Sequence, residues 1–226
     1  MIAPAVAPPR QSTTKDVVDE LLETVSATRL NCWQQCRLKF WYRYVLRLKK
    51  PPQSAFHVGS VVHSVLQAWN LARWRHKAVD VVALKQVFQT NWQESLAGQT
   101  INWKGEEEEH RSMAWSLLET YFRDTPITLE EKPEAVEVCV EADLSIHGLP
   151  KIVGVIDLVR AGGRIVDFKT TGQTPSPEKA KHLNEVQTSC YSVMYREATG
   201  RQESGIELHH LVKLKTPKLV VTPFEP

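Results

Sequence analysis

The sequence has few cysteines and no long apolar run, and each absence excludes a class of protein. Four cysteines in 226 residues do not form the disulfide framework of a small secreted domain. No window approaches the roughly 20 apolar residues of a membrane span. Residues 1–10 also lack the basic lead and the hydrophobic length of a signal peptide. We therefore expect a cytoplasmic protein that makes no contact with a membrane.

Two further absences concern function. The chain has no Gly-x4-Gly-Lys-Ser/Thr run, so nothing indicates a nucleotide-driven motor. Its net charge is only +2, so a nucleic-acid partner must be argued from the distribution of cations, not from their sum. Cys32 and Cys36 have a metal-ligand spacing, but Cys139 and Cys190 are scattered, so we expect no zinc site.

The pattern of apolar residues predicts helices first and a mixed α/β arrangement afterwards. Periodicity and capping residues predict helices at 16–25, 29–48, 56–75, 79–96 and 106–123, with Ser26 or Thr28 as the cap of the second. Alternation predicts strands at 134–147, 151–159, 164–170, 207–215 and 219–222. Ser176 and Gly200 delimit one further helix between the third and fourth strands. This order predicts an α/β sandwich with a mostly antiparallel or mixed sheet and an N-terminal helical lobe.

The same pattern predicts the domain organisation. Residues 1–14 are expected to be a flexible tail, followed by a single domain at 15–226. Within this domain we expect a helical part at 15–125 and an α/β core at 133–226. Residues 221–226 stop without a closing element, which leaves a truncated C-terminus open.

Two carboxylates and a lysine fall on a predicted β-hairpin at 151–170. If its loop, Ala161-Gly162-Gly163, closes symmetrically, Arg160 pairs with Arg164, Leu158 with Val166, and Asp157 with Asp167. Directly opposed residues have Cβ atoms roughly 4.5–5.5 Å apart, so the two carboxylates would lie side by side.

The faces of this hairpin follow from alternation. Asp157 and Val159 would share one face, while Ile156 and Leu158 would take the other. On the partner strand, Asp167 and Lys169 share a face. Like charges so close destabilise a sheet unless a cation holds them, which favours a metal site. The alternative is a pair of edge-strand charges on a solvated face.

Two helices carry further candidates. His63 lies on a polar helical stripe, with Gly59 one turn before it. This position is typical of a ligand that faces a cleft, but also of an ordinary surface histidine. Gln187 and Tyr191 line one face of the helix after the hairpin. They are interpreted either as core and rim residues or as groups that position Lys169 or contact a phosphate.

The segment 29–50 contains seven Lys or Arg residues and no acid. A helical stripe of cations beside Trp41 suits a polyanion whose bases can stack. A solvated cationic face over an aromatic core would have the same pattern. The predicted nucleic-acid-binding residues are Lys39, Arg43, Arg47, Lys50 and Trp41.

The joint order of these motifs resembles the PD-(D/E)XK nuclease superfamily, and specifically its RecB-like branch of exonucleases. The resemblance rests on the segments Gly59-Ser60-Val61-Val62-His63, Gly154-Val155-Ile156-Asp157, Asp167-Phe168-Lys169-Thr170 and Gln187-Thr188-Ser189-Cys190-Tyr191. It implies a restriction-endonuclease-like core, with a mixed, largely antiparallel sheet flanked by helices.

The resemblance also implies a site. His63, Asp157, Asp167 and the backbone carbonyl of Phe168 would hold Mg²⁺ or Mn²⁺. Lys169 would orient or deprotonate the attacking water, and Gln187 and Tyr191 would complete the catalytic set. Many relatives carry an iron–sulfur cluster, for which Cys36 matches the first ligand. The later cysteines of that motif are absent, so no cluster is expected for the chain as given.

The predicted function is therefore a metal-dependent deoxyribonuclease. We expect an exonuclease that acts on DNA ends or single strands in repair or recombination, with a helicase or another repair subunit as a further partner. The alternative is a module that binds nucleic acid or a helicase through a nuclease-like fold without cutting.

Overall fold

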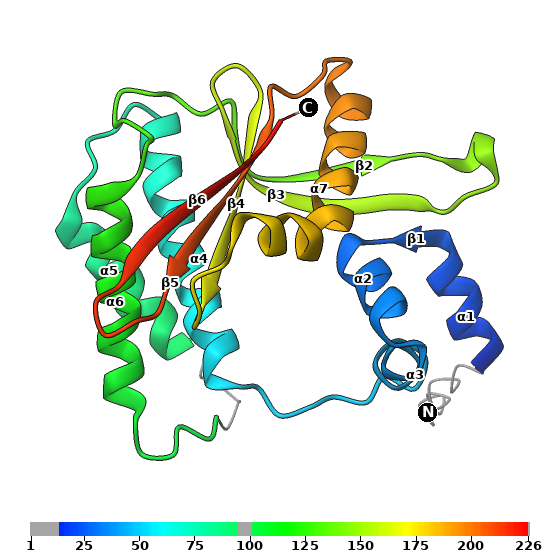
Figure 1. Ribbon diagram of the computed structural model, residues 1–226, viewed down its shortest axis with the longest axis horizontal. Helices are drawn as coiled ribbons and strands as arrows, with labels where there is room; N and C mark the ends of the chain where they lie inside the picture. The colour runs from blue at the N-terminus through cyan, green and yellow to red at the C-terminus, as the bar shows by residue number, and fades with distance from the viewer. Residues whose placement is uncertain (1–13, 95–100, 226) are drawn as a thin grey trace, which may run out of the picture.

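A mixed sheet forms the centre of the structure, and helices lie on both of its faces (Figure 1). The computed structural model describes residues 14–94 and 101–225. The predicted flexible tail at 1–14 therefore lies outside the described residues, except for Thr14, which begins helix α1. None of the described helices combines the length and the hydropathy that a bilayer span requires.

The N-terminal lobe consists of short elements. They are α1 (Thr14–Glu23), β1 (Thr24–Val25), α2 (Ala27–Gln35), α3 (Arg37–Phe40) and the π-helix η1 (Trp41–Val45). Ser26 caps α2, since its hydroxyl accepts a hydrogen bond from Arg29 N at 3.4 Å. Val25, which was predicted to end the first helix, is instead the second residue of β1.

The prediction of one helix over 29–48 is wrong. Cys36 has extended backbone angles (φ −164°, ψ 107°) that end α2, and its Sγ accepts a hydrogen bond from Lys39 N at the start of α3. The wider turns of η1 follow, and Arg47 has a left-handed φ of 52°. Arg47 and Lys50 therefore lie outside any helix, and the four cations do not form the predicted helical stripe.

Three longer helices cover one face of the sheet. They are α4 (Ser54–Trp74), α5 (Val81–Glu94) and α6 (Glu107–Asp124). Residue 96, the predicted end of the second of these, lies outside the described residues. Val62, Val65 and Leu66 of α4 are fully buried against Leu158 and Val166 of the sheet. Burial of this apolar stripe fixes α4, and with it His63, over the hairpin.

The sheet contains six strands in the order β1-β3-β4-β5-β6, with β2 also paired to β3. Their bounds are β2 (Ala135–Ala142), β3 (Lys151–Arg160), β4 (Arg164–Thr171), β5 (Ile206–Val212) and β6 (Lys218–Phe224). A 3₁₀ turn, η2 (Ser145–His147), follows β2, where the prediction had continued the strand. The pairs β2–β3, β3–β4 and β5–β6 are antiparallel, whereas β1–β3 and β4–β5 are parallel. The predicted mixed, largely antiparallel sheet is confirmed.

Helix α7 (Pro177–Thr199) connects the parallel strands β4 and β5 and covers the other face. Ser176 accepts a hydrogen bond from Lys179 N at 3.3 Å, and Gly200 ends the helix in a left-handed conformation, as predicted. Met194 and Tyr195 pack with Ile156 and Ile165 in a second buried cluster. This packing directs one turn of α7 toward the hairpin.

A network of charges joins the hairpin loop to the rest of the sheet. Arg160 donates two hydrogen bonds to Glu131, at 2.8 and 2.9 Å, and one to Glu207 at 3.0 Å. Glu207 also contacts the buried ring of His209 at 3.1 Å. The side chains of Arg160, Glu131 and Glu207 retain only 17, 19 and 12% exposure, so each charge depends on its partners.

Candidate metal centre between strands β3 and β4

The hairpin has the predicted register up to the residues before the two aspartates. Arg160 pairs with Arg164 and Leu158 with Val166, and the two glycines of the loop have φ values of 79° and 77°. Beyond these pairs, β3 and β4 separate, so Asp157 and Asp167 do not form the directly opposed pair that was predicted. Asp157 fills the gap, because its Oδ2 accepts a hydrogen bond from Phe168 N at 2.8 Å. This side chain replaces the backbone acceptor that β4 loses where the strands part.

The faces of β3 change at the same point, which corrects the prediction that Ile156 and Leu158 share a face. Ile156 packs in the cluster beneath α7, as does Val159, whereas Leu158 packs in the cluster beneath α4. Opposite Asp157, Glu137 of β2 has a left-handed φ of 48°. A non-glycine residue in this region distorts the strand locally, which accounts for the broken alternation.

Three acids consequently lie in a row across three strands. The pairs that flank them place Glu137 opposite Asp157, and Asp167 lies across the fork, close enough for its charge to act on both of these acids. Burial, followed by the charge of Asp167, raises the pKa of Asp157 well above its usual value, and Glu137 adds to this effect. Burial and Asp167 also raise the pKa of Glu137. The ionised row is unfavourable without a cation.

Glu137 was missed by the sequence analysis. Ligand atoms of His63, Glu137 and Asp157 all lie within 4.8 Å of one another, which is the spacing of groups that can share a metal ion. The alternation of 134–147 placed Glu137 on a strand, but no signal in the sequence showed which strand it would pair with or which face it would occupy.

His63 reaches this row from α4. Its Nδ1 lies 3.6 Å from Asp157 Oδ2, and its ring contacts the ring edge of Phe168 with 6.1 Å between centroids. A Cβ on Gly59, one turn earlier, would lie 3.1 Å from Thr170 Oγ1, so glycine allows α4 to approach β4 closely. Burial lowers the pKa of His63 more than Asp167 raises it, which favours the neutral imidazole that can bind a metal.

Asp167 is held by a second set of groups. Its Oδ1 accepts hydrogen bonds from Gln187 Nε2 and from the hydroxyl of Tyr191, both at 2.9 Å. Its Oδ2 lies 2.8 Å from Lys169 Nζ as an ion pair, and accepts no directed hydrogen bond from any described residue. One carboxylate oxygen is thus fixed, and the other keeps lone pairs available for a cation.

Gln187 and Tyr191 lie on one face of α7, as predicted, and connect Asp167 with Lys169. Gln187 Oε1 accepts a hydrogen bond from Lys169 Nζ at 2.7 Å, while its Nε2 donates to Tyr191 at 2.7 Å. Burial, followed by the charges of Asp167 and Asp157, raises the pKa of Tyr191, so its hydroxyl keeps its proton and donates. Lys169 therefore has a defined position at the edge of the carboxylate row.

The structure brings together the side chains of the predicted metal and catalytic set. His63, Asp157, Asp167 and Lys169 converge on one region, whereas the role of the Phe168 carbonyl stays a prediction. Two carboxylates and an imidazole within reach of one another, with Asp167 beside them, are donors that suit Mg²⁺ or Mn²⁺. The residues present therefore fit a divalent cation.

The predicted nucleic-acid-binding residues lie apart from this centre, in the N-terminal lobe and the segment that follows it. Trp41 is 43% exposed, and Lys39, Arg43 and Lys50 are exposed as well. Arg47 is exposed too, and forms an ion pair with Glu20 of α1 at 2.5 Å.

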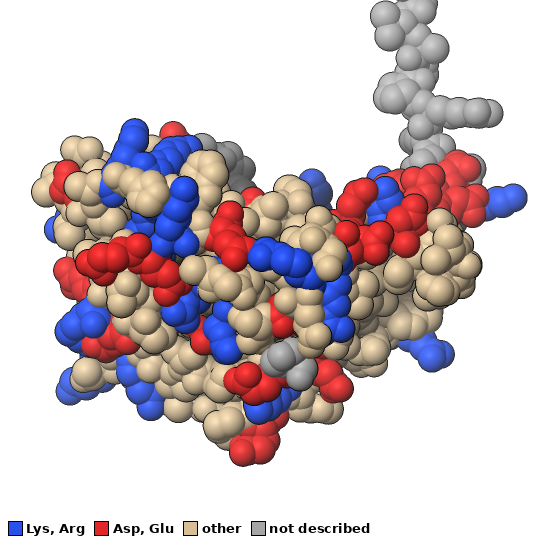
Figure 2. All heavy atoms as spheres, turned by 90° about the horizontal axis from the view of Figure 1, so that it is seen from above, with Lys and Arg blue, Asp and Glu red and all other residues tan. Residues whose placement is uncertain are grey.

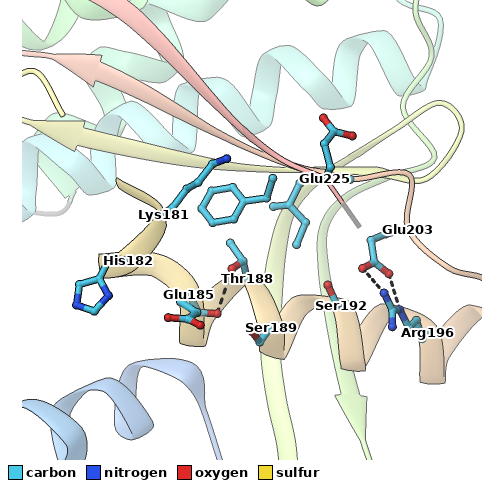
Figure 3. Close-up of a pocket in the computed structure, with 12 residues that line it drawn as sticks. Lys181, His182, Glu185, Thr188, Ser189, Ser192, Arg196, Glu203 and Glu225 are labelled. Atoms are coloured by element: carbon cyan, nitrogen blue, oxygen red, sulfur yellow. Dashed lines mark hydrogen bonds and ion pairs between the residues drawn. The ribbon is translucent and has the colours of Figure 1, made fainter. Parts of the chain in front are cut away.

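The cavity shown in Figure 3 is not part of the metal centre. It has a volume of about 520 Å³ and lies between α7 and the ends of β5 and β6. Lys181, Glu185 and the ion pair of Arg196 with Glu203 line it, whereas His63, the three acids, Lys169, Gln187 and Tyr191 are not among its lining residues. The chemistry of the carboxylate row is therefore at the fork between β3 and β4, not in this cavity.

Comparisons with known proteins agree with this geometry. A crystal structure from Eubacterium rectale, described as a "putative exonuclease", superposes with a TM-score of 0.65 at 16% identity and covers 95% of this chain and 78% of that one. At such identity the likeness concerns the fold alone. No curated protein matches the chain. The family model of the PD-(D/E)XK nuclease superfamily matches residues 24–222, which contain every residue of the centre. The chain therefore belongs to the PD-(D/E)XK nuclease superfamily.

Proposed function

We propose that this protein is a metal-dependent deoxyribonuclease that hydrolyses phosphodiester bonds. The observation that carries the proposal is the row of three carboxylates at the fork, with a neutral imidazole on one side and an ammonium group on the other. A nucleic-acid phosphate and a divalent cation are the groups that would neutralise this arrangement. Residues 15–226 are proposed to form one nuclease domain.

His63, Glu137, Asp157 and Asp167 would hold the cation, with the Phe168 carbonyl as a further ligand. A bound Mg²⁺ or Mn²⁺ polarises a phosphoryl oxygen and makes water a better nucleophile. The role of this chain is to place charges around that reaction. The fixed Oδ1 of Asp167 leaves Oδ2 directed at Lys169, and the hydrogen bond to Gln187 leaves the ammonium further donors for a water or a phosphate.

Gln187 and Tyr191 would act as positioning residues. Each donates to Asp167, and Gln187 also accepts from Lys169, so loss of either relaxes the orientation of both charged groups. A hydrogen bond to a charged group contributes about 1.5–3 kcal/mol. Gln187→Ala should therefore lower kcat about 10- to 150-fold with a small change in KM.

The finer parts of the proposal rest on the comparisons, on the exposed cations and on the motifs. Exonucleolytic action agrees with the description of the Eubacterium rectale structure, and action on ends or single strands agrees with exposed cations in the N-terminal lobe. A role in repair or recombination, a helicase partner and a cytoplasmic location follow from the resemblance of the motifs and from composition. Each is proposed on that ground.

The experiment that tests the function is cleavage of end-labelled single- and double-stranded DNA with Mg²⁺, Mn²⁺ or EDTA. Asp167→Asn and Lys169→Met should abolish cleavage, because each removes a charge from the centre while keeping the volume of the side chain. Asp143→Asn, an exposed carboxylate between β2 and β3, is the matched control and should cut as the wild type does.

Two results would contradict the proposal. Cleavage that survives both substitutions would place the activity elsewhere or in a contaminant. Tight DNA binding with no cleavage under either metal would favour a binding module with a nuclease fold. Labelled RNA of the same sequence separates a deoxyribonuclease from a ribonuclease.

A further inference from the structure

Three aromatic side chains of the N-terminal lobe are exposed where most proteins bury such groups. Trp33, Trp41 and Tyr42 are 47, 43 and 47% exposed. Leu38 and Leu48, at 60 and 59%, lie beside them in sequence. Single exposed apolar residues are ordinary, but a cluster on one short segment marks a binding surface. We refer to residues 27–50 as the basic–aromatic segment.

The rings of this segment are held in place by one another. Trp33 meets the half-buried Phe40 edge to face, with 5.2 Å between centroids, and Phe40 lies 4.9 Å from Tyr44. Trp41 and Tyr42 follow directly in the π-helix η1, a rare geometry that occurs frequently at functional sites. Of the three exposed rings, Trp33 is therefore supported by Phe40, and Trp41 and Tyr42 are placed by the backbone of η1.

The segment itself carries only positive charges, and α1, which packs against η1, supplies Glu20 as the partner of Arg47. Residues 24–79 contain ten Lys or Arg residues and no Asp or Glu, although the whole chain carries a net charge of only +2. The face of the molecule shown in Figure 2 carries both signs, with acidic side chains gathered at one end. Arg37 lies 5.3 Å above the Trp33 ring, and Arg43 lies 5.2 Å above the Tyr44 ring. Within the described ranges, neither arginine forms an ion pair with a carboxylate.

The basic–aromatic segment is connected to the metal centre on two sides. Helix α2 packs against α7, which carries Gln187 and Tyr191, and against β3, which carries Asp157. The segment then continues through residues 51–53 into α4, the helix that carries His63 (Figure 1). A nucleic acid bound to this lobe would therefore lie next to α7, β3 and α4, the elements that carry residues of the metal centre.

We propose that the basic–aromatic segment binds unpaired nucleotides, with Trp33, Trp41 and Tyr42 as stacking surfaces and Arg37 and Arg43 beside the backbone phosphates. In a duplex the bases are stacked on one another, so only an unpaired base can lie against a side-chain ring. The excess of cations over acids in this segment favours a polyanion over an apolar protein partner. The inference rests on the proposed function, because it names the form of nucleic acid that reaches the metal centre.

The test measures binding without cleavage, by fluorescence anisotropy of labelled oligothymidylate and of a blunt duplex of equal length in EDTA. The wild type should bind the single strand more tightly than the duplex. Trp41→Ala should weaken single-strand binding about 5- to 150-fold, the range for loss of one base–aromatic stack, while Trp41→Phe retains most of it. Trp74→Ala is the matched control, because Trp74 is also 43% exposed but lies at the end of α4.

A charge variant keeps the proposal testable if the aromatic variants unfold. The double variant Arg37→Gln with Arg43→Gln should lower the affinity for the single strand. It should also reduce the slope of the logarithm of the binding constant against the logarithm of salt concentration, by about 0.7 for each phosphate that the protein no longer neutralises. Equal affinity for duplex and single strand, or wild-type affinity in both Trp33→Ala and Trp41→Ala, overturns the inference and leaves the proposed nuclease intact. Conversely, selective single-strand binding with no cleavage under either metal supports the inference while the nuclease proposal fails.

Discussion

The carboxylate row leads to a prediction about stability in the absence of metal. Asp157 lies beside Glu137 and Asp167, and burial together with these charges raises its pKa. A carboxyl whose pKa is higher in the folded state than in the unfolded chain favours folding only while it is protonated. Its contribution is therefore complete below the unfolded pKa, about 3.9, and is lost as pH rises through the folded pKa. The metal-free protein should lose stability over that window.

Asp157→Asn removes this loss, because asparagine cannot ionise. Its side-chain oxygen can still accept the hydrogen bond from Phe168 N. Each pKa unit by which the carboxyl is raised corresponds to about 1.4 kcal/mol, or about 3–6 °C in Tm for a chain of this size. In EDTA at neutral pH, the variant should therefore melt above the wild type.

Metal should reverse this order. A cation at about 100 times its Kd stabilises the folded wild type by about 2.7 kcal/mol, or about 5–11 °C. Asp157→Asn loses an anionic ligand and should gain little from Mg²⁺ or Mn²⁺. The wild type should consequently melt above the variant at saturating metal.

Thermal unfolding followed by circular dichroism from pH 5 to pH 8, with EDTA, Mg²⁺ or Mn²⁺, measures both effects. Asp143→Asn is the control, since Asp143 also accepts a backbone hydrogen bond, from Ser145 N at 2.9 Å, but is exposed and lies outside the fork. The reasoning is refuted if Asp157→Asn melts below the wild type in EDTA at every pH. It is also refuted if metal raises the Tm of both proteins equally.

Two further predictions concern the scaffold. Arg160→Met leaves the partly buried carboxylates of Glu131 and Glu207 without their main partner, so it should lower the free energy of unfolding by about 3 kcal/mol in urea titrations. Lys151→Met breaks an exposed ion pair and should not move the urea midpoint. Gly163→Ala should lower the Tm more than Gly162→Ala. Both glycines have a left-handed φ, but only at Gly163 would a Cβ lie 2.5 Å from the Tyr195 hydroxyl. Equal losses of Tm in the two variants would exclude that contact as the cause.

Much of the fold was predictable because its signals are local. The loop at 161–163 determined the register of the hairpin, since glycine supplies the left-handed angles that a short connection needs. Ser176 and Gly200 delimited α7 through their own side-chain and backbone preferences. The prediction of one helix at 29–48 was wrong, because its composition is helical but the extended backbone at Cys36 interrupts it.

By itself, the sequence determined the chemistry available at the site: His63, Asp157, Asp167, Lys169 and the Gln187-x3-Tyr191 pair, because each depends on a motif within one element or one hairpin. Only the tertiary structure added Glu137, whose place depends on the pairing of β2 with β3 and on a left-handed backbone angle. Likewise, only the tertiary structure shows that the exposed Arg47 forms an ion pair with Glu20 of α1. Contacts between elements distant in the chain arise from the packing of the whole, and no local pattern of residues specifies them.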